Sequence, residues 1–487
     1  MSVAKQAARG VAWNMLLGVS SRMLQLVGTL ILTRFIAPDE YGAVLTASIA
    51  VVTAGVLTSF AFGQHIIAKK ATPEVAFQAL VVHLGLGVVA MAVLYVVRYP
   101  LGDALDVPDM GDFLYAYAIA HILDRARYIP ERLLMRALRF RTIATINASG
   151  EVAFTAASLI MASRWGANAI IFGVLVRAVI TCALFFRLAP RDEWFVPTKL
   201  RWVDVHDLFS YGLPIMIAAV ADRAATRWDN LIMSKLFGPG VMGRYNLSYS
   251  LAEMPVNNIA EQIGEVLMPS FSRMEDDQRR RAVVRAPMLM GVIISPLGVG
   301  LGAVSTTVVA TFFDERWHGM GPMLAVLSTM TVFRPMTWSA IAYCQAVQQT
   351  RLVMFSSFLR AIVVLALVAI FGYVGGPLWA CVGGGIGYAL HSILTIIFAG
   401  RLVGFPVGAY LIGVARPLLP CIPMFLAVMG VEETLTGRMH NALVLGAEVI
   451  TGAVVYVISA FILVRPAVDE IIRLGREAIG RRSKTGK

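Results

Sequence analysis

The segment that decides the fold is RFIAPDEYG at residues 34–42, and a related segment, KLFGPGVMG, occupies residues 235–243. The second begins 201 residues after the first, and the two share a basic first residue, a proline and a final glycine without any gap. In each, proline ends one helix and glycine allows a tight turn into the next. Short hairpins of any kind also collect proline and glycine. The same spacing, however, pairs Arg22 with Arg223 in the preceding helices, which favours an internal repeat.

On both sides of the repeat the sequence is strongly apolar. The 487 residues are 58% hydrophobic and 15% charged, with a mean hydropathy of +0.72, whereas soluble domains are about 25% charged. Apolar runs of about 20 residues, the length that crosses a bilayer, recur from end to end. This composition argues against a soluble enzyme, a nucleic-acid-binding protein and a disulfide scaffold. The net charge of +12 fits cytoplasmic loops and lipid headgroups.

The apolar runs predict an all-α integral membrane protein with about fourteen transmembrane helices. Twelve is the alternative, because the fourth run is interrupted by charges and the thirteenth is short and rich in proline. The predicted spans are residues 11–34, 42–63, 77–97, 113–130, 142–163, 167–188, 208–235, 243–269, 287–312, 322–347, 352–373, 377–399, 416–431 and 442–464.

The repeat divides these spans into lobes. Six spans separate its two copies, so both halves have the same topology and are related by a pseudo-two-fold axis along the membrane normal. Transporters built this way hold their substrate between the halves and rock one half against the other. We predict an N-terminal lobe at 1–190, a cytoplasmic linker at 191–207, a C-terminal lobe at 208–400, an extra pair of spans at 401–465 and a basic, amphipathic cytoplasmic tail at 466–487.

The distribution of charge predicts the orientation. If the N-terminus is cytoplasmic, more than half of the 42 Lys and Arg residues fall on cytoplasmic segments. The loop at 99–112, with four aspartates, is then external, and the loop at 272–285, with three consecutive arginines, is cytoplasmic. Both termini are therefore predicted to be cytoplasmic.

Recognisable catalytic or metal-binding motifs are missing from the sequence. The four cysteines lie inside apolar runs without CxxC spacing, which indicates neither disulfides nor a zinc site. The glycine cluster at 383–387 lies within a predicted span, where it favours close helix packing or a flexible point. We find no Walker motif and no nucleophile elbow. We expect no cofactor, no metal and no enzymatic activity.

Arginines inside the predicted spans indicate a polar cavity, because a charge at mid-bilayer costs about 2.5–3.5 kcal/mol. Arg22 lies in span one, Arg223 and Arg227 in span seven and Arg334 in span ten. Arg223 and Arg227 are four residues apart and share a helix face. Taken together, arginines outnumber acids on these spans, and such a cavity suits a diphosphate, which guanidinium groups bind bidentately. The alternative is a set of ion pairs that only holds the helices together.

Acidic residues of the spans are candidates for ion coupling. Asp222 and Asp229 flank the arginine face of span seven. Glu261 and Glu265 are four residues apart on span eight, where two carboxylates on one face repel unless one binds a proton or a metal cation. The alternative to ion coupling is that the two glutamates simply form ion pairs with the nearby Arg273.

Several motifs carry a resemblance to a known family. They are ARGVAW at 8–13, TRFIAPDEYG at 33–42, WDNLI at 228–232, GRYN at 243–246, and Pro255 and Pro269 on the next span. The sequence resembles the polysaccharide-exporter (Wzx-type) flippases of the multidrug/oligosaccharidyl-lipid/polysaccharide exporter superfamily. The resemblance covers nearly the whole chain and is densest over 8–63 and 208–275.

This resemblance implies a transporter of the bacterial inner membrane. Such proteins flip undecaprenyl-diphosphate-linked oligosaccharide to the outer leaflet for exopolysaccharide, capsule or O-antigen (lipopolysaccharide) assembly, by alternating access coupled to H+ or Na+. The diphosphate would be held by cavity arginines, for which Arg22, Arg223, Arg227 and Arg334 are the candidates by position. Partners would be membrane lipids, a glycan polymerase and export machinery, with no nucleic acid.

Three other functions compete with this one. A drug/cation antiporter of the same superfamily should favour acidic and aromatic residues in its cavity, against the arginine surplus seen here. A lipid II flippase shares fourteen spans and a cationic cavity, and the sequence separates it poorly from an oligosaccharide flippase. A membrane glycan polymerase would need a larger external loop for its chemistry.

Overall fold

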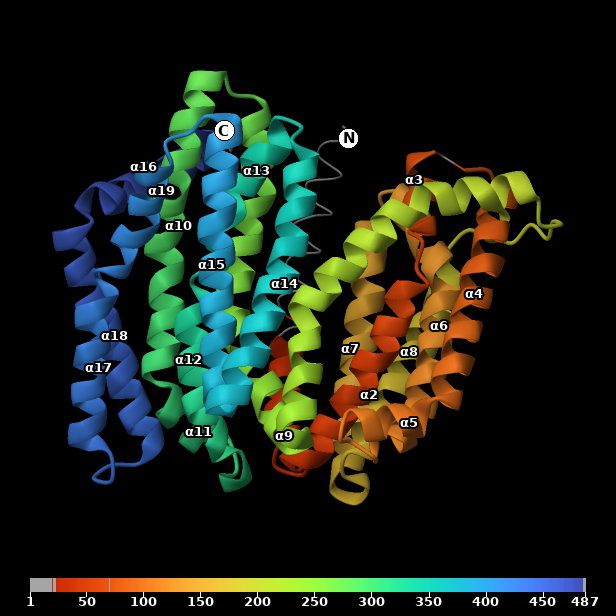
Figure 1. Cartoon of the computed structure of the whole chain (residues 1–487), viewed down its shortest axis with the longest axis horizontal. Helices are drawn as coiled ribbons and strands as arrows, with labels where there is room; N and C mark the ends of the chain where they lie inside the picture. The colour runs from red at the N-terminus through yellow and green to blue at the C-terminus, as the bar shows by residue number, and fades with distance from the viewer. Residues whose placement is uncertain (1–19, 21–22, 70, 485–487) are drawn as a thin grey trace. The chain divides into compact units, whose positions relative to one another are not determined.

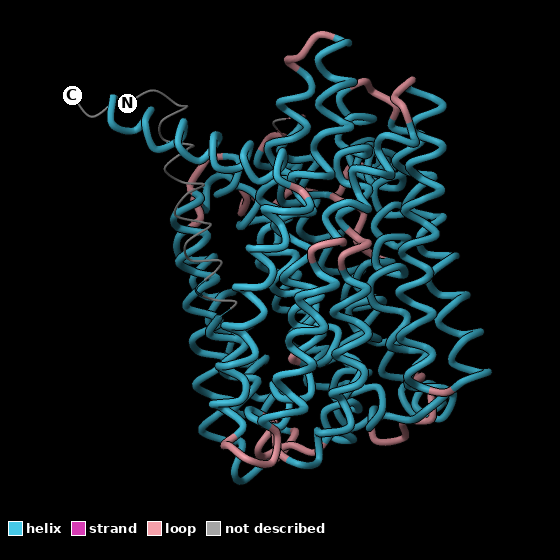
Figure 2. Tube along the Cα trace, turned by 90° about the vertical axis from the view of Figure 1, so that its left-hand side faces the viewer, coloured by secondary structure: helices cyan, strands magenta, loops and turns pink. Residues whose placement is uncertain are grey.

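In the computed structural model, residue 20 and residues 23–69 and 71–484 are described, with side chains left aside at 257–266, 268, 269, 350, 474, 475 and 477–484. All regular secondary structure in this part of the chain is helical, with short loops and no strand (Figure 2). The chain divides into two compact units, Met1–Gly243 and Arg244–Lys487. The division into an N-terminal lobe at 1–190 and a C-terminal lobe at 208–400, joined by a linker at 191–207, stays a prediction.

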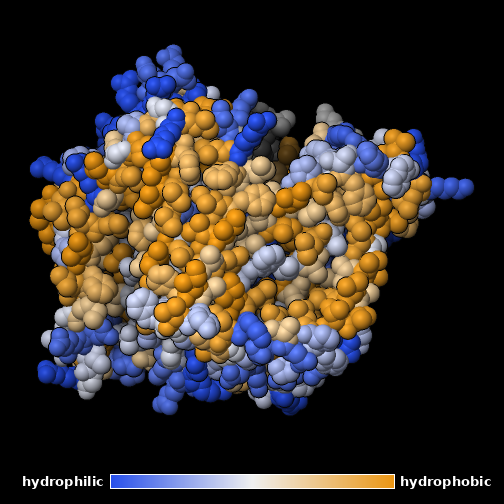
Figure 3. All heavy atoms as spheres, in the orientation of Figure 1, coloured by the Kyte–Doolittle hydropathy of each residue, from blue (hydrophilic) through white to orange (hydrophobic). Residues whose placement is uncertain are grey.

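Ten helices of the described residues are long and apolar enough to cross a membrane. The difference from fourteen has four local causes. The first span is described only as the short helix Met23–Leu32, the fourth carries too many charges, the seventh and eighth run together, and the tenth is broken into short pieces. On the face shown in Figure 3, hydrophobic side chains cover the middle of each unit and hydrophilic ones gather at the helix ends, as a bilayer requires.

The first unit is a bundle of long helices with short connecting helices (Figure 1). Its main contacts join α6 to α2, α4 and α8, and α7 to α8. The elements are α2 (Pro38–Leu57), α3 (Phe62–Ala68), α4 (Pro73–Val96), α5 (Arg98–Ala104), α6 (Met110–Arg136), α7 (Phe140–Trp165), α8 (Asn168–Leu188), the short 3-10 helix η1 (Arg191–Glu193) and the first part of α9 (Trp202–Ser272).

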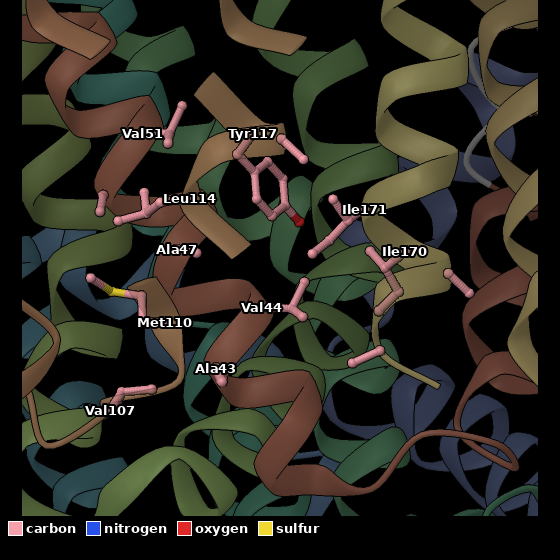
Figure 4. Close-up of a cluster of buried hydrophobic side chains, with 14 of the residues drawn as sticks. Ala43, Val44, Ala47, Val51, Val107, Met110, Leu114, Tyr117, Ile170 and Ile171 are labelled. Carbon is pink, nitrogen blue, oxygen red and sulfur yellow. The ribbon is translucent and has the colours of Figure 1, made fainter. Parts of the chain in front are cut away.

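A buried apolar cluster holds α2, α6 and α8 together (Figure 4). Helix α2 contributes Ala43, Ala47 and Val51, spaced at four residues so that they share one helix face. From α6, Leu114 reaches the same cluster, as does Ile171 from α8. The small alanines let the helices approach closely, which is how helices associate where lipid removes the hydrophobic driving force.

The two copies of the sequence repeat contact each other within the first unit. A Cβ atom on Gly42 would overlap the carbonyl oxygen of Pro239, and a Cβ atom on Gly243 would overlap that of Pro38. The contact is therefore reciprocal, as an interface on a two-fold axis must be. The turn that the sequence assigned to these two glycines was wrong in detail, since both lie inside helices, and their role is to let the two backbones touch.

The turn predicted at 235–243 is present as a break inside α9. Gly238 has φ 80° and ψ 173°, a conformation essentially restricted to glycine, and it separates two helical stretches that otherwise run on continuously. This break divides spans seven and eight where the sequence placed their boundary.

The second unit contains the remaining elements (Figure 1). Two of its long helices, α14 and α15, pack closely because two glycines of the predicted cluster face α14. A Cβ atom on Gly387 would lie 2.9 Å from Val364 Cα, and one on Gly383 would overlap the Leu367 carbonyl. The elements are α10 (Asp276–Ala303), α11 (Ser305–Phe312), η2 (Glu315–Met320), α12 (Gly321–Thr331), η3 (Pro335–Thr337), α13 (Trp338–Ala346), α14 (Thr350–Gly375), α15 (Pro377–Val403), α16 (Val407–Ala415), η4 (Arg416–Leu418), α17 (Cys421–Leu435), α18 (Asn441–Leu463) and α19 (Arg465–Lys484).

The last three helices pack onto α10. The Tyr456 hydroxyl of α18 donates a 2.7 Å hydrogen bond to the Val292 carbonyl. Helix α19 is tied to α10 by an ion pair between Glu470 and Arg285. Val468 and Ile471 of α19 pack against a buried apolar cluster that includes Val292 of α10 and Tyr456 of α18. This part of the basic tail therefore packs on the second unit.

Candidate functional site

A buried arginine organises one end of the first unit. Arg125 of α6 is only 3% exposed. Its guanidinium donates hydrogen bonds to the carbonyl oxygens of Gly55, Thr58 and His83, to the Thr58 hydroxyl, and through Nε to His121 Nε2 at 3.1 Å. Gly55 and Thr58 lie at the C-terminal end of α2, where the last carbonyls lack helical partners and carry the negative end of the helix dipole. Arg125 therefore caps α2 from a neighbouring helix.

The charges that interrupt the fourth apolar run have different environments. Arg127 pairs along α6 with Asp124 at 2.7 Å and with Glu131 at 3.0 Å, and all three side chains are partly exposed. Arg125, between them in sequence, points inward and binds backbone carbonyls. Sequence alone does not distinguish it from its neighbours, because its partners are peptide groups that any residue supplies.

The arginines predicted for span seven lie on α9 in the first unit. Arg223 and Arg227, one turn apart, are both partly exposed, and Asp222 beside them is exposed. Asp229 is only 2% exposed, and its Oδ1 accepts hydrogen bonds from the backbone and side-chain nitrogens of Asn230 at 2.9 and 3.0 Å. The two aspartates that flank the arginines in sequence therefore differ in environment: Asp222 is exposed and Asp229 is buried.

The arginine predicted for span ten lies in the second unit, within an aromatic cluster. Arg334 forms an ion pair with Glu253, and both side chains are largely buried. Its Nη1 also donates to the Tyr249 hydroxyl at 3.2 Å, and that hydroxyl is 3.1 Å from the Tyr388 hydroxyl. The guanidinium carbon lies 4.9 Å from the centre of the Tyr388 ring, within range of a cation–π interaction.

This cluster was only partly predictable. Glu253 and Tyr249 are four residues apart, so their common helix face is visible in the sequence. Tyr388 comes from α15, and no local pattern connects it with Arg334. The cluster places a phenol–phenol pair beside a guanidinium, an arrangement that can bind anionic or hydroxyl-rich groups.

The remaining predicted site residues fall outside what the structure describes. Arg22 lies beyond the described residues, and so do the side chains of Glu261 and Glu265. Among the residues that are described, no three His, Cys, Asp or Glu side chains are grouped to hold a metal ion.

Comparison with known proteins gives the family. Residues 31–322, more than half of the chain, match the family described as polysaccharide biosynthesis protein. The lipopolysaccharide biosynthesis protein WzxC of Escherichia coli K12 is 23% identical over 452 residues, covering 90% of each chain. The succinoglycan biosynthesis transport protein ExoT of Rhizobium meliloti is 23% identical over 501 residues, covering 99% of this chain and 98% of its own.

Among solved structures, the lipid II flippase MurJ in an inward closed conformation superposes with a TM-score of 0.75. It is 13% identical and matches over 93% of this chain and 99% of its own. At that identity the similarity concerns the fold alone. The helical membrane fold predicted from the sequence is confirmed. With a helical fold and a family match across more than half of its length, this chain belongs to the polysaccharide biosynthesis proteins.

Proposed function

We propose that this protein flips undecaprenyl-diphosphate-linked oligosaccharide repeat units across the bacterial inner membrane, by alternating access driven by an ion gradient. The observation that carries the proposal is the end-to-end similarity to transport proteins of polysaccharide biosynthesis, with 99% of the chain aligned to ExoT. Both termini are cytoplasmic in this proposal, and the product enters exopolysaccharide, capsule or O-antigen assembly.

The charges of the site support an anionic substrate. Arg223 and Arg227 share one partly exposed face of α9, which suits the two phosphates of a diphosphate. Arg334, with Tyr249 and Tyr388, offers a guanidinium beside hydroxyl and ring surfaces, which suits phosphate or sugar. Arg22 completes the proposed set by its position in the repeat. Asp222, Asp229, Glu261 and Glu265 remain the proposed ion-coupling residues of this region.

A lipid II flippase is the nearest alternative. Its fold is shared, but the sequence relatives reported above are named for lipopolysaccharide and succinoglycan. A drug/cation antiporter fits the surplus of arginine less well, because a cationic cavity repels cationic drugs.

The test is complementation of a strain from which the gene has been deleted. Wild type, Arg223→Ala and Arg164→Ala would be compared at equal membrane abundance. Arg164 is the control, since it is an exposed arginine at the C-terminal end of α7. Surface polysaccharide and inner-leaflet lipid-linked oligosaccharide would both be measured.

We expect the deletion to lose surface polysaccharide and to accumulate lipid-linked oligosaccharide in the inner leaflet. Wild type and Arg164→Ala should restore export, and Arg223→Ala should not. If the deletion strain keeps its surface glycan and becomes more sensitive to cationic drugs, the proposed flippase function is wrong and the protein is a drug/cation antiporter. Full export by Arg223→Ala would remove this arginine from the site.

A further inference from the structure

A fully buried glutamate, which is not among the site residues proposed above, lies in α18, one of the helices long and apolar enough to span the membrane. Glu448 is 0% exposed. It is the eighth residue of α18, about 10 Å along the axis from the first, at about 1.5 Å per residue. Its carboxyl group is therefore within the apolar part of the helix, where an ionised side chain costs about 2.5–3.5 kcal/mol even on the lenient insertion scale.

The contacts of Glu448 satisfy only half of its carboxyl group. Oε1 accepts a 2.8 Å hydrogen bond from the hydroxyl of Thr307, which is itself buried in α11. Oε2 is buried and has no hydrogen-bond partner in the described part of the chain. The surrounding helices contribute an apolar cluster that contains Val304 and Val428.

No cation faces this carboxyl group among the described residues. Helices α10, α11, α17 and α19 all pack against α18. Helix α11 and residues 290–303 of α10 carry no acidic or basic side chain. Glu432 of α17 is close enough to repel a negative charge on Glu448, and Glu433 is exposed. Two neutral titratable groups lie within the packed helices: the Tyr456 hydroxyl of α18, which donates to the Val292 carbonyl, and the Cys421 thiol at the start of α17. The remaining charged or titratable groups lie at residues 276–285 of α10, in the loop before α18 or on α19: Arg438, His440, Arg465, Asp469, Glu470, Arg473 and Arg476.

Thr307 reaches Glu448 because span nine is broken. Helix α10 ends at Ala303 and α11 begins at Ser305, so Thr307 lies in the first turn after the break. Discontinuous helices of transporters commonly line ion and substrate sites, because the break frees polar groups at membrane depth. Glu448 is thus a buried acid with one hydroxyl donor, an acidic neighbour and no counter-ion among the side chains that the structure describes.

We infer that Glu448 and Thr307 form a proton-binding site between α11 and α18, which holds the carboxyl group neutral and releases its proton during transport. The bond that breaks and re-forms is the carboxyl O–H bond. The proton passes to water on one side of the membrane and is replaced from the other. The binding site itself is independent of the substrate, whereas its link to transport rests on the proposed function and names the coupling ion as H+.

The first test asks whether the carboxyl group holds a proton. Dicyclohexylcarbodiimide, an apolar reagent, reacts with protonated carboxyl groups in membranes: the acid proton moves to a carbodiimide nitrogen, and the oxygen bonds to its central carbon, before rearrangement to a stable N-acylurea. Purified protein in lipid nanodiscs would be labelled from acidic to alkaline pH, and the modified residue would be identified by peptide mass spectrometry. Glu448→Gln removes the target, and Glu433→Gln is the matched control on an exposed glutamate.

We expect labelling of Glu448 in wild type and in Glu433→Gln, with a decline as the pH rises, and none at residue 448 in Glu448→Gln. Thr307→Val should shift the pH at which labelling declines. A Glu448 that stays unlabelled at every pH would overturn the proton site. Protection by added Na+ at constant pH would replace it with a sodium site.

The second test asks whether the proton is used. Glycan flipping would be measured in inside-out vesicles under an imposed pH gradient, with wild type and with Glu448→Gln, which resembles the neutral acid and should preserve folding. We expect wild type to respond to the gradient and Glu448→Gln to lose the response. A full response in Glu448→Gln would overturn the coupling role. No flipping by wild type would contradict the proposed function, and the labelling result would still decide the proton site.

Discussion

Arg125 shows how a cation can be buried in this fold without an acidic partner. Its hydrogen bonds go to backbone carbonyls at the end of α2 and to neutral histidine and threonine side chains. The end of a helix supplies a fixed partial negative charge, so the protein compensates the guanidinium with peptide dipoles. The planar group reaches several acceptors at once, which an ammonium group cannot do.

This explanation predicts that Arg125→Lys destabilises the protein nearly as much as Arg125→Ala. Each charged hydrogen bond that is lost should cost about 1.5–3 kcal/mol, and the single ammonium group of lysine cannot replace the several N–H donors of the planar guanidinium. The measurement is thermal unfolding in detergent, with Arg139→Ala, an exposed position at the start of α7, as the control. A lysine variant with the melting temperature of wild type would show that charge alone is sufficient at this site.

The pair formed by Arg334 and Glu253 allows a binding role to be separated from a structural one. Either single alanine substitution should destabilise the protein, because an unpaired, largely buried group costs about 1–3 kcal/mol. The exchanged double variant Arg334→Glu, Glu253→Arg should recover the melting temperature but not glycan export, because the guanidinium has moved away from Tyr388. Recovery of both properties would assign the pair to structure only.

At this scale the sequence identifies candidates but not their partners. It predicts that Arg223 and Arg227 share a face, because that follows from helical periodicity. It cannot tell that Asp229 is buried and Asp222 exposed, or that Arg125 points inward while Arg127 pairs along its own helix. Those outcomes depend on which neighbouring helix lies opposite, and α6 packs mainly against three of its neighbours, α2, α4 and α8.

At the scale of elements, the contact between the two repeat segments predicts the effect of a single methyl group. Gly42 lies inside α2, where alanine would normally stabilise a helix by about 0.5–1 kcal/mol. Here its Cβ atom would overlap the Pro239 carbonyl, and backbone atoms yield little, so Gly42→Ala should destabilise the protein by about 1–3 kcal/mol.

The matched control is Gly85→Ala in α4, where a Cβ atom has open space around it. Gly85→Ala should leave the melting temperature unchanged or raise it, while Gly42→Ala lowers it. Equal melting temperatures for the two variants would mean that the repeat segments do not touch in the folded protein in its detergent micelle.

The helices themselves were largely predictable, and their breaks were less so. Long apolar runs such as 352–373 and 442–464, each with a single charged residue, coincide with α14 and α18, because length and apolarity leave a membrane segment no other regular structure. Span ten, in contrast, is divided into α12, η3 and α13 around Arg334 and Pro335. A proline in an apolar run indicates a possible break, but the new direction of the chain depends on tertiary packing.

For the whole molecule, the predicted orientation can be tested with the native cysteines left in place. All four are buried, so a membrane-impermeant maleimide should not label wild type. On intact cells, Asp103→Cys in the predicted external loop should be labelled, and Asp277→Cys in the predicted cytoplasmic loop should be labelled only after permeabilisation. Both positions are exposed. The reverse pattern would place both termini outside.

Composition and the repeat were sufficient to predict a polytopic membrane protein with two related halves. The fold is confirmed by the helical structure and by the similarity to MurJ. The candidate arginines could be named from the sequence because they lie inside apolar runs, and Arg223 falls in the first unit and Arg334 in the second. Their partners could not be named, because Tyr388, for example, comes from a helix that no local pattern connects with Arg334.

The reciprocal contact of the repeat segments also bears on how the protein can evolve. In a homodimer that met at such a contact, every substitution would appear on both sides at once. In a single chain the two sides are inherited separately, and they have diverged: the first copy has Asp39, and the second has Gly240 at the equivalent position, where the missing side chain leaves room for the Asp39 carboxyl group. Gly42 and Gly243 have not diverged, because neither side can gain a side chain while the backbones touch.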